Sequence, residues 1–525
     1  MVNLIRDRWI PAIRKDRTEV CIAPWEVTRD HETNPVVHLR APRADFNGAL
    51  IQFLIGLMQT VIPPSTDRAW FKKFESPPDP DYLQGEFEKV AHAFEVDGDG
   101  ARFMQDFDLA EGVETSIDHL LIEMPGKKTL EDNTDHFIKR DTVRQICPSC
   151  SAMALFTLQT NAPSGGSGHR TSLRGGGPLT TIVMGRTLWE TVWLSVVPTD
   201  SFARYGNADL QGEADIFPWL APTRTSESGG DTTPQDVNPA QMYWGMPRRV
   251  RLDCDGTTQG ICDLCGCRSE RLITSYRTKN LGVNYNGNWR HTLTAYSTNK
   301  TGDLLSQKGQ PGGVSYRNWL GLVQNDAESK IEPAVVVHTF RYDRQPDLPE
   351  VPFRLWAFGY DMDNMKARCW YEGTMPLTRV DPIHRAEYEA VTAQLIRTAS
   401  LVAFSTRTAI KKAIFSEKAE VRGDLSMIDA RFWQDTEAEF YTTLHLLKDA
   451  IACGEDATAV KRRWLAVLGR EAETLFEDFS QANLIGVADP KRIALARRDL
   501  RNFTSIRNKK IQKTLDIQPD NQPQR

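Results

Sequence analysis

Two short stretches, Cys147-Pro-Ser-Cys150 and Cys262-Asp-Leu-Cys265-Gly, decide how the first part of this 525-residue chain is held together. A two-residue spacer lets both thiolates of a pair point at one ion, and two such pairs supply the four ligands of a tetrahedral zinc site. About 110 residues separate the pairs, so the metal would join distant parts of one domain. We therefore predict structural Zn²⁺ bound by Cys147, Cys150, Cys262 and Cys265, with no position left open for catalysis.

The same cysteines admit two other interpretations. A C-x-x-C pair can be a thiol redox centre, although no thioredoxin-like βαβ pattern lies nearby. The thiols can also be buried without metal, and Cys254 or Cys267 can replace a predicted ligand. The first residues lack the apolar core of a signal peptide, and the most apolar run, 49–62, is shorter than the roughly 20 residues a bilayer needs. We therefore predict a cytoplasmic protein without disulfides or membrane segments.

Outward from the cysteines, the pattern changes from mixed elements to long helices. Apolar residues recur at helical spacing from Asp45 until Pro63-Pro64 ends the run. The motif Tyr285-Asn286-Gly287-Asn288 predicts a hairpin. Helical patterns then cover roughly 384–416, 428–452, 456–480 and 487–513. The predicted fold class is α+β: a mixed α/β domain with the zinc site over 1–375, followed by a four-helix bundle over 376–525.

Charge is balanced over the chain but not along it. With 64 Lys and Arg against 69 Asp and Glu, the net charge of −5 excludes a histone-like polycation, and 40% apolar residues exclude a disordered chain. Residues 491–513, however, hold nine basic residues and one acid, and Arg407, Lys411 and Lys412 end a stretch without acids. Such stretches neutralise phosphates, or they form a solvated helix face.

A glycine-rich loop over 163–178 has six glycines, Arg170, Arg174 and no acid. Glycine lets backbone approach a ligand closely, so the loop is a candidate to contact phosphate or the edge of a groove, or it is only a flexible connector. Walker, G-x-S-x-G and H-E-x-x-H motifs are absent from the sequence. The usual sequence signals of an enzyme are therefore missing; the alternative to a binding role is a zinc-dependent nucleic-acid hydrolase or nuclease.

Several motifs occur together in an order that resembles one family over nearly the full chain, the large subunit (CasA) of the type I-E CRISPR surveillance complex, Cascade. The glycine-rich loop just after the first cysteine pair is the most specific. The motifs are DRWIP (7–11), EDNTDHF (131–137), CPSC followed by ALF (154–156), NAPSGGSGHRTSLRGGGPLTT (161–181), CDLCG, YNGNW (285–289) and the helical C-terminus.

The resemblance implies a subunit that binds and does not catalyse. It would recognise the protospacer-adjacent motif in double-stranded DNA from the minor groove, help open the duplex and recruit the helicase-nuclease. Its other partners would be the crRNA 5′ handle and the backbone, small and crRNA 5′-end subunits of Cascade. Minor-groove readout is degenerate, which suits a family that tolerates several motifs.

The resemblance implies roles for individual positions of this chain. The glycine loop in the minor groove falls on Gly165, Gly166, Ser167 and Gly168, where Ser167 departs from the usual glycine. The resemblance also implies that the family's lysine finger falls on Lys279 and Asn280, with Asn280 rather than Lys279 at the finger itself.

The resemblance also implies positions for the remaining contacts. The wedge between base pairs falls on Asp363, Asn364 and Met365, with Asn364 where glutamine is typical and Met365 as an apolar wedge. The loop 124–140 corresponds to the family's contact with the crRNA 5′ handle, through Asn133, His136 and Phe137. Arg407, Lys411 and Lys412 would guide target DNA or the displaced strand.

Overall fold

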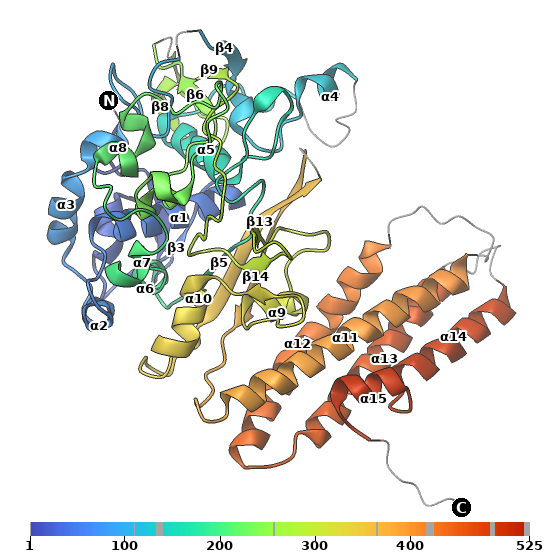
Figure 1. Cartoon of the computed structure of the whole chain (residues 1–525). Coiled ribbons are helices and arrows are strands. Elements are labelled where there is room, and N and C mark those ends of the chain that lie inside the picture. The colour runs from blue at the N-terminus through green and yellow to red at the C-terminus, as the bar shows by residue number, and fades with distance from the viewer. Residues whose placement is uncertain are drawn as a thin grey trace, which may run out of the picture. The chain divides into compact units, whose positions relative to one another are not determined.

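The computed structural model describes two units of the chain (Figure 1). The N-terminal unit comprises Met1–Gly309, Ala334–Val337 and Leu355–Glu372, and the C-terminal unit comprises Gln310–Pro333, His338–Arg354 and Gly373–Arg525. The continuous part of the C-terminal unit begins close to the predicted boundary, and two earlier segments join it. The described residues are 2–109, 111–132, 140–255, 258–363, 366–415, 425–482 and 489–518.

The strands of the N-terminal unit form several small sheets. Three-stranded sheets have the orders β2-β1-β3, β4-β9-β6 and β14-β13-β5, and β7 pairs with β8 and β10 with β11. Short strands suit this sequence because glycine, proline and asparagine interrupt most β-branched runs. The strands described in the whole chain, of which β12 belongs to the C-terminal unit, are β1 (Ile10–Arg14), β2 (Glu19–Ile22), β3 (Val36–Leu39), β4 (Val113–Ser116), β5 (Thr180–Met184), β6 (Arg249–Leu252), β7 (Thr258–Ile261), β8 (Arg268–Leu272), β9 (Ser275–Lys279), β10 (Tyr296–Thr298), β11 (Leu304–Ser306), β12 (Ile331–Glu332), β13 (Arg354–Asp363) and β14 (Lys366–Pro376).

Helices pack against these sheets in the N-terminal unit and dominate the C-terminal unit. Those in the first part of the chain are α1 (Ala44–Val61), α2 (Asp67–Glu75), α3 (Pro80–Glu88), α4 (Lys127–Glu131), α5 (Pro148–Asn161), α6 (Leu188–Leu194), α7 (Thr199–Ala203) and α8 (Glu213–Ile216). They are followed by α9 (Trp319–Leu322), α10 (Val335–Thr339), α11 (Arg385–Ile414), α12 (Ser426–Ala452), α13 (Thr458–Ala482), α14 (Pro490–Thr504) and α15 (Lys509–Leu515). Among the described residues, no helix has both the length and the apolar character needed to cross a bilayer.

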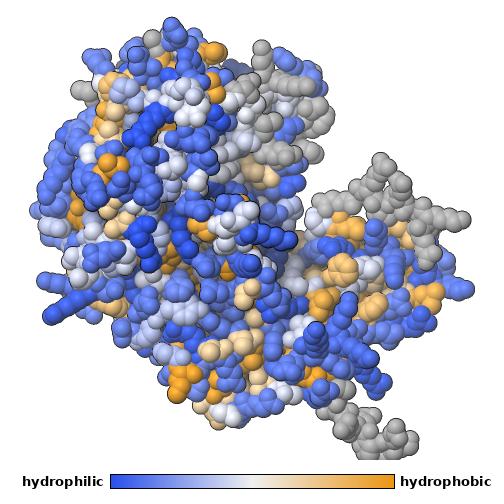
Figure 2. All heavy atoms as spheres, in the orientation of Figure 1, coloured by the Kyte–Doolittle hydropathy of each residue, from blue (hydrophilic) through white to orange (hydrophobic). Residues whose placement is uncertain are grey.

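The predicted apolar helix is α1, and it forms the centre of the N-terminal core. Its Phe53 ring packs edge-on against the rings of Trp9, Phe94 and Trp244, at centroid distances of 5.3, 5.7 and 5.8 Å. Aromatic pairs of this geometry add to the free energy gained by burying their area. These contacts hold segments that are far apart in the sequence around one helix. The face of the molecule visible in Figure 2 is mostly hydrophilic, with scattered apolar residues.

The C-terminal unit confirms the predicted bundle, with one correction. Stacked Tyr316 and Phe440 rings, 4.3 Å apart, lie in its core, and the Trp464 indole donates a hydrogen bond to the Leu395 carbonyl. The single helix predicted over 487–513 is wrong, because α14 ends at Thr504 and α15 begins at Lys509. The Asn508 side chain accepts hydrogen bonds from the first backbone N–H groups of α15, which makes it a helix N-cap.

The hairpin predicted at Tyr285–Asn288 is also wrong. Gly287 does turn the chain with a φ of 87°. The Tyr285 backbone, however, bridges to Thr232, and its hydroxyl accepts a hydrogen bond from the Met246 N–H. The turn therefore anchors a loop to another part of the unit and does not join two paired strands.

Candidate functional site

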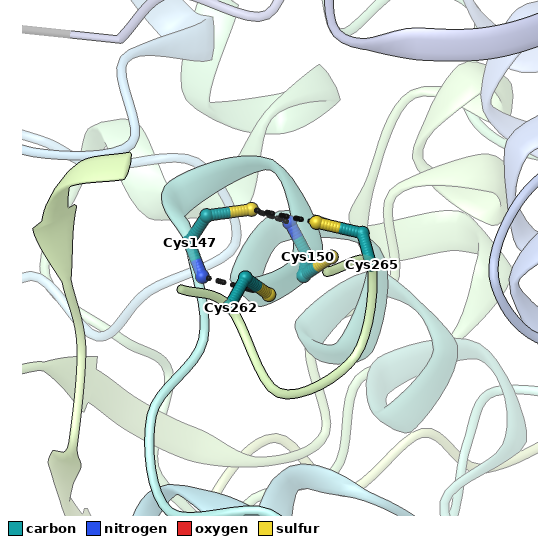
Figure 3. A group of neighbouring side chains, drawn as sticks. All are labelled: Cys147, Cys150, Cys262 and Cys265. Atoms are coloured by element: carbon teal, nitrogen blue, oxygen red, sulfur yellow. Dashed lines mark hydrogen bonds between the residues drawn. The ribbon is translucent and has the colours of Figure 1, made fainter. Parts of the chain in front are cut away.

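The four predicted zinc ligands come together, as the sequence analysis expected (Figure 3). Cys147 is the N-cap of α5 and Cys150 lies in its first turn, whereas Cys262 and Cys265 lie in the turn between β7 and β8. Their sulfur atoms all lie within 4.8 Å of one another, and the sulfurs of Cys147 and Cys265 are 3.9 Å apart. The group thus joins the start of a helix to a turn that is distant in sequence.

The geometry of this group fits zinc. Zn–S bonds of about 2.3 Å place tetrahedral sulfur ligands about 3.8 Å apart. Backbone N–H groups of Cys147 and Cys150 point at the sulfurs of Cys262 and Cys147, at 3.3 and 3.5 Å. Hydrogen bonds from Cys147 and Cys150 lower the pKa of Cys262, whereas the hydrogen bond with Cys147 raises the pKa of Cys150. Four adjacent thiolates need a cation to ionise together, and a bound Zn²⁺ would supply it.

The glycine loop follows α5 directly and makes a short 3₁₀ turn over Gly166–Gly168. Gly168 has a φ of +83°, and a Cβ there would lie 2.6 Å from the Leu281 side chain. A Cβ on Gly165 would lie 2.6 Å from the His169 Cβ. A Cβ on Gly166 would meet nothing within 4 Å, and this residue is exposed. The chain path therefore requires glycine at 165 and 168, whereas Gly166 presents bare backbone to its surroundings. Ser167 occupies the middle of the turn.

The structure brings the predicted finger residues to this loop. Lys279 ends β9, and its ammonium lies 3.5 Å from the Glu227 carboxylate. Asn280 comes next, and the backbone N–H of Leu281 donates a 3.0 Å hydrogen bond to the Gly168 carbonyl. A backbone hydrogen bond therefore joins the residues just after β9 to the glycine turn.

The predicted wedge lies between β13 and β14. Asn364 and Met365 are outside the described residues, and Asp363 is the last residue of β13. The Asp363 carboxylate lies 3.8 Å from the Arg368 guanidinium, which also binds Asp361 through two hydrogen bonds. Arg368 therefore offsets negative charge at the end of this strand.

One groove of about 1070 Å³ connects these elements within the N-terminal unit. Its walls include the glycine loop, β4, the segment that leads into α4, the end of β9 and the first residue of β14. Gly165, Gly166, His169, Arg248, Thr278 and Lys366 are among its lining residues. The glycine loop, β9 and the start of β14, which lie more than 80 residues from one another in the sequence, thus share one concave surface.

The family assignment rests on the sequence as a whole. The family model of CRISPR-associated protein Cse1 matches residues 3–475. The chain belongs to the Cse1 family. The resemblance to the CasA large-subunit family, drawn from the motifs, is thereby confirmed.

Solved structures agree with this assignment at the level of the fold. Cse1 of Thermobifida fusca is 17% identical with a TM-score of 0.73, covering 96% of this chain and 98% of that one. CasA of Thermus thermophilus is also 17% identical with a TM-score of 0.71, covering 96% and 99%. A chain of a CRISPR RNA-guided surveillance complex is 14% identical with a TM-score of 0.67, covering 96% and 99%. At these identities the likeness shows the fold alone.

Other predicted contacts of this Cse1-family chain are divided between described and undescribed parts. Asn133, His136 and Phe137 lie outside the described residues. In the C-terminal unit, Arg407 is ion-paired with Asp429, and the Lys412 ammonium lies 3.5 Å from Asp499. Lys411 is exposed near the end of α11.

The structure gives three basic residues of the N-terminal unit an environment that the sequence did not predict. Arg174 is buried, and its guanidinium donates to Gln52, Thr180 and Thr294. Lys308 donates to the Arg174 carbonyl at 2.8 Å. Arg248 lines the groove, and its guanidinium donates to the Pro163 carbonyl just before the glycine loop. Their partners are neutral and mostly distant in sequence, so only the glycine-rich stretch around Arg174 gave a local signal.

Proposed function

We propose that this Cse1-family chain is the large subunit of a type I-E RNA-guided surveillance complex and recognises the protospacer-adjacent motif in double-stranded DNA. In this proposal, exposed backbone around Gly166 enters the minor groove. The β13–β14 hairpin then separates the first base pairs so that the guide RNA can pair. The chain supplies binding and no bond chemistry, and the opened target is passed to a recruited helicase-nuclease.

The observation that carries the proposal is the groove lined by the glycine loop, the end of β9 and Lys366. Motif reading and strand opening must act on adjacent base pairs, so the elements for both must share one surface. Bare backbone suits a minor groove about 6 Å wide, because a side chain would hold the backbone away from the base edges. Guide pairing reads the rest of the sequence, so the protein needs to read only a short motif.

The four-cysteine group supports the assembly of this surface and not catalysis. With four sulfur ligands, a bound zinc ion has no position for an activated water, which a hydrolytic site requires. The zinc would hold the start of α5 against the β7–β8 turn, and the other end of α5 leads into the glycine loop. The zinc-dependent nuclease alternative would require sulfur-poor coordination and metal-stimulated cleavage of DNA.

Gly166→Leu tests the proposal without disturbing the chain path, because a side chain at this position points into open space. We expect reconstituted complexes with this variant to bind motif-bearing duplex at least about tenfold more weakly, because the leucine blocks close approach to the base edges. Binding to a target that is already melted should stay the same, since no motif reading is needed there. Equilibrium binding measured on both DNAs gives the answer.

Gly85→Leu is the matched control, since Gly85 is exposed on α3 with nothing within 4 Å of its Cβ position. It should bind both DNAs as wild type does. Equal binding of Gly166→Leu and wild type to motif-bearing duplex would reject the role of the glycine loop.

A further inference from the structure

Lys308 occupies an unusual position beside the second glycine cluster of the loop. It follows β11, its backbone bridges to Pro178, and the next residue, Gly309, bridges to Asp361 of β13. Within the part of the chain that the structure describes, its ammonium donates a hydrogen bond to the Arg174 carbonyl. An ammonium has three N–H donors, so this bond leaves further donor capacity at the edge of the turn.

Among the described residues, the charge next to Lys308 comes from Arg174 and is positive. Arg174 beside it is fully buried and bonded to neutral side chains. Burial and the neighbouring Arg174 lower the pKa of Lys308 to about 7. Within the described ranges, the structure shows no ion pair for either cation. A buried arginine next to a partly buried lysine, without a carboxylate, is costly unless an anion joins them or the lysine loses its proton.

Glycines shape the space beside this ammonium. Gly175 has a φ of +76°, and a Cβ there would lie 2.7 Å from the Lys308 Nζ. Gly177 has a φ of +58°, and a Cβ there would lie 2.6 Å from the Met362 Cγ of β13. Any larger residue would therefore fill the space next to the ammonium or push away the strand that leads to the hairpin tip. Both Gly175 and Gly176 keep some exposure to solvent.

We infer that Lys308 and the turn Gly175–Gly177 form a phosphate site, and that its ligand is a backbone phosphate of a nucleic-acid strand held beside the β13–β14 hairpin. The inference rests on the proposed function. Lys308 remains partly accessible to solvent, so a phosphate can reach it. Asp361 is the acidic residue whose backbone pairs with Gly309, next to Lys308. Its carboxylate accepts two hydrogen bonds from Arg368 and does not neutralise the site.

The test uses reconstituted complexes that contain Lys308→Met, Lys308→Arg or Lys300→Met, on motif-bearing and motif-free duplexes over a series of KCl concentrations. One lost phosphate contact should weaken binding of Lys308→Met about 3- to 10-fold on both DNAs and reduce the salt slope by about one. Lys308→Arg keeps the charge and should stay within about twofold of wild type. Lys300 is exposed in the β10–β11 turn, so Lys300→Met should behave as wild type.

Two outcomes would overturn the inference. One is an unchanged affinity and salt slope for Lys308→Met. The other is stabilisation of the wild-type chain, but not of Lys308→Met, by millimolar inorganic phosphate together with unchanged DNA binding, which would assign the site to a free anion. A failure of the proposed function gives a different result, because a wild-type complex would then bind motif-bearing and motif-free duplex equally. A melting temperature at or above that of wild type shows that Lys308→Met is folded.

Discussion

In the C-terminal unit Arg497 and Arg501 of α14 face carboxylates, whereas in the N-terminal unit Arg174 is buried against neutral groups and Lys308 is partly buried beside it. Arg497 pairs with Glu473 and Glu477 of α13, and Arg501 makes two hydrogen bonds to Glu473. A dense run of basic residues is therefore partly neutralised by the neighbouring helix, while Arg174 and Lys308 have no carboxylate partner among the described residues. The number of basic residues in a segment says less about anion binding than the partners that the fold gives them.

The first and largest test of this comparison is removal of the metal ligands. Cys262→Ser should lose bound zinc and lower the stability of the N-terminal unit by several kcal/mol, because metal binding and folding are coupled. The bundle of the C-terminal unit has its own core and should unfold at an unchanged temperature. Metal content by mass spectrometry and unfolding by calorimetry measure both effects.

Cys254→Ser serves as the control, because Cys254 lies outside the four-cysteine group. It should keep one zinc per chain and the wild-type melting profile. If Cys262→Ser kept both as well, the metal would not be what holds the start of α5 to the β7–β8 turn.

The cysteine group and the long helices were predictable because their signals are local or repeat at a fixed spacing. The C-x-x-C spacing determines that the two sulfur atoms of each pair point toward one ion. The apolar stripe from Phe432 to Ile451 determines which face of α12 is buried. The break between α14 and α15 was missed, although Asn508 is a typical N-cap residue, because the apolar and basic pattern continues through it.

The environment of the basic residues could not be predicted from one sequence. Arg174 binds Gln52 across 122 positions, and Arg501 binds Glu473 across 28. Such pairings depend on which elements the fold places side by side, and no spacing rule connects them. The groove has the same origin, since its walls come from the glycine loop, β4, β9 and β14.

A second test uses the pH dependence of stability. Lys308 has a pKa of about 7 in the folded chain, against an ordinary value of 10.5. Between these values the unfolded chain binds more protons, so wild-type stability should rise with pH across this window. Lys308→Met should lose this rise and gain about 1–2 kcal/mol at pH 7, less than the full shift implies because Lys308 is partly exposed.

Chemical denaturation of the two proteins from pH 7 to pH 10 measures the difference. Lys300→Met should follow the wild-type curve, since its ammonium is exposed. Parallel curves for wild type and Lys308→Met would show that the Lys308 ammonium is compensated in the folded chain, and the contrast between the two units would fail.

The smallest effect is expected from a test that compares two basic residues of the bundle, one paired with a carboxylate and one exposed. Arg501 is held by two hydrogen bonds to Glu473, so Arg501→Gln should leave DNA binding by the complex unchanged and lower stability only slightly, because the pair is exposed to solvent. Lys411 is exposed and forms no ion pair in the described part of the C-terminal unit, so Lys411→Gln should weaken binding about two- to threefold on every DNA sequence and lower the salt slope. Salt titrations of both variants show whether DNA binding by the bundle depends on which basic residues are unpaired or on its total charge. Equal losses for the two variants would mean that the bundle acts through its summed charge, and pairing with α13 would then not determine which basic residues are available to DNA.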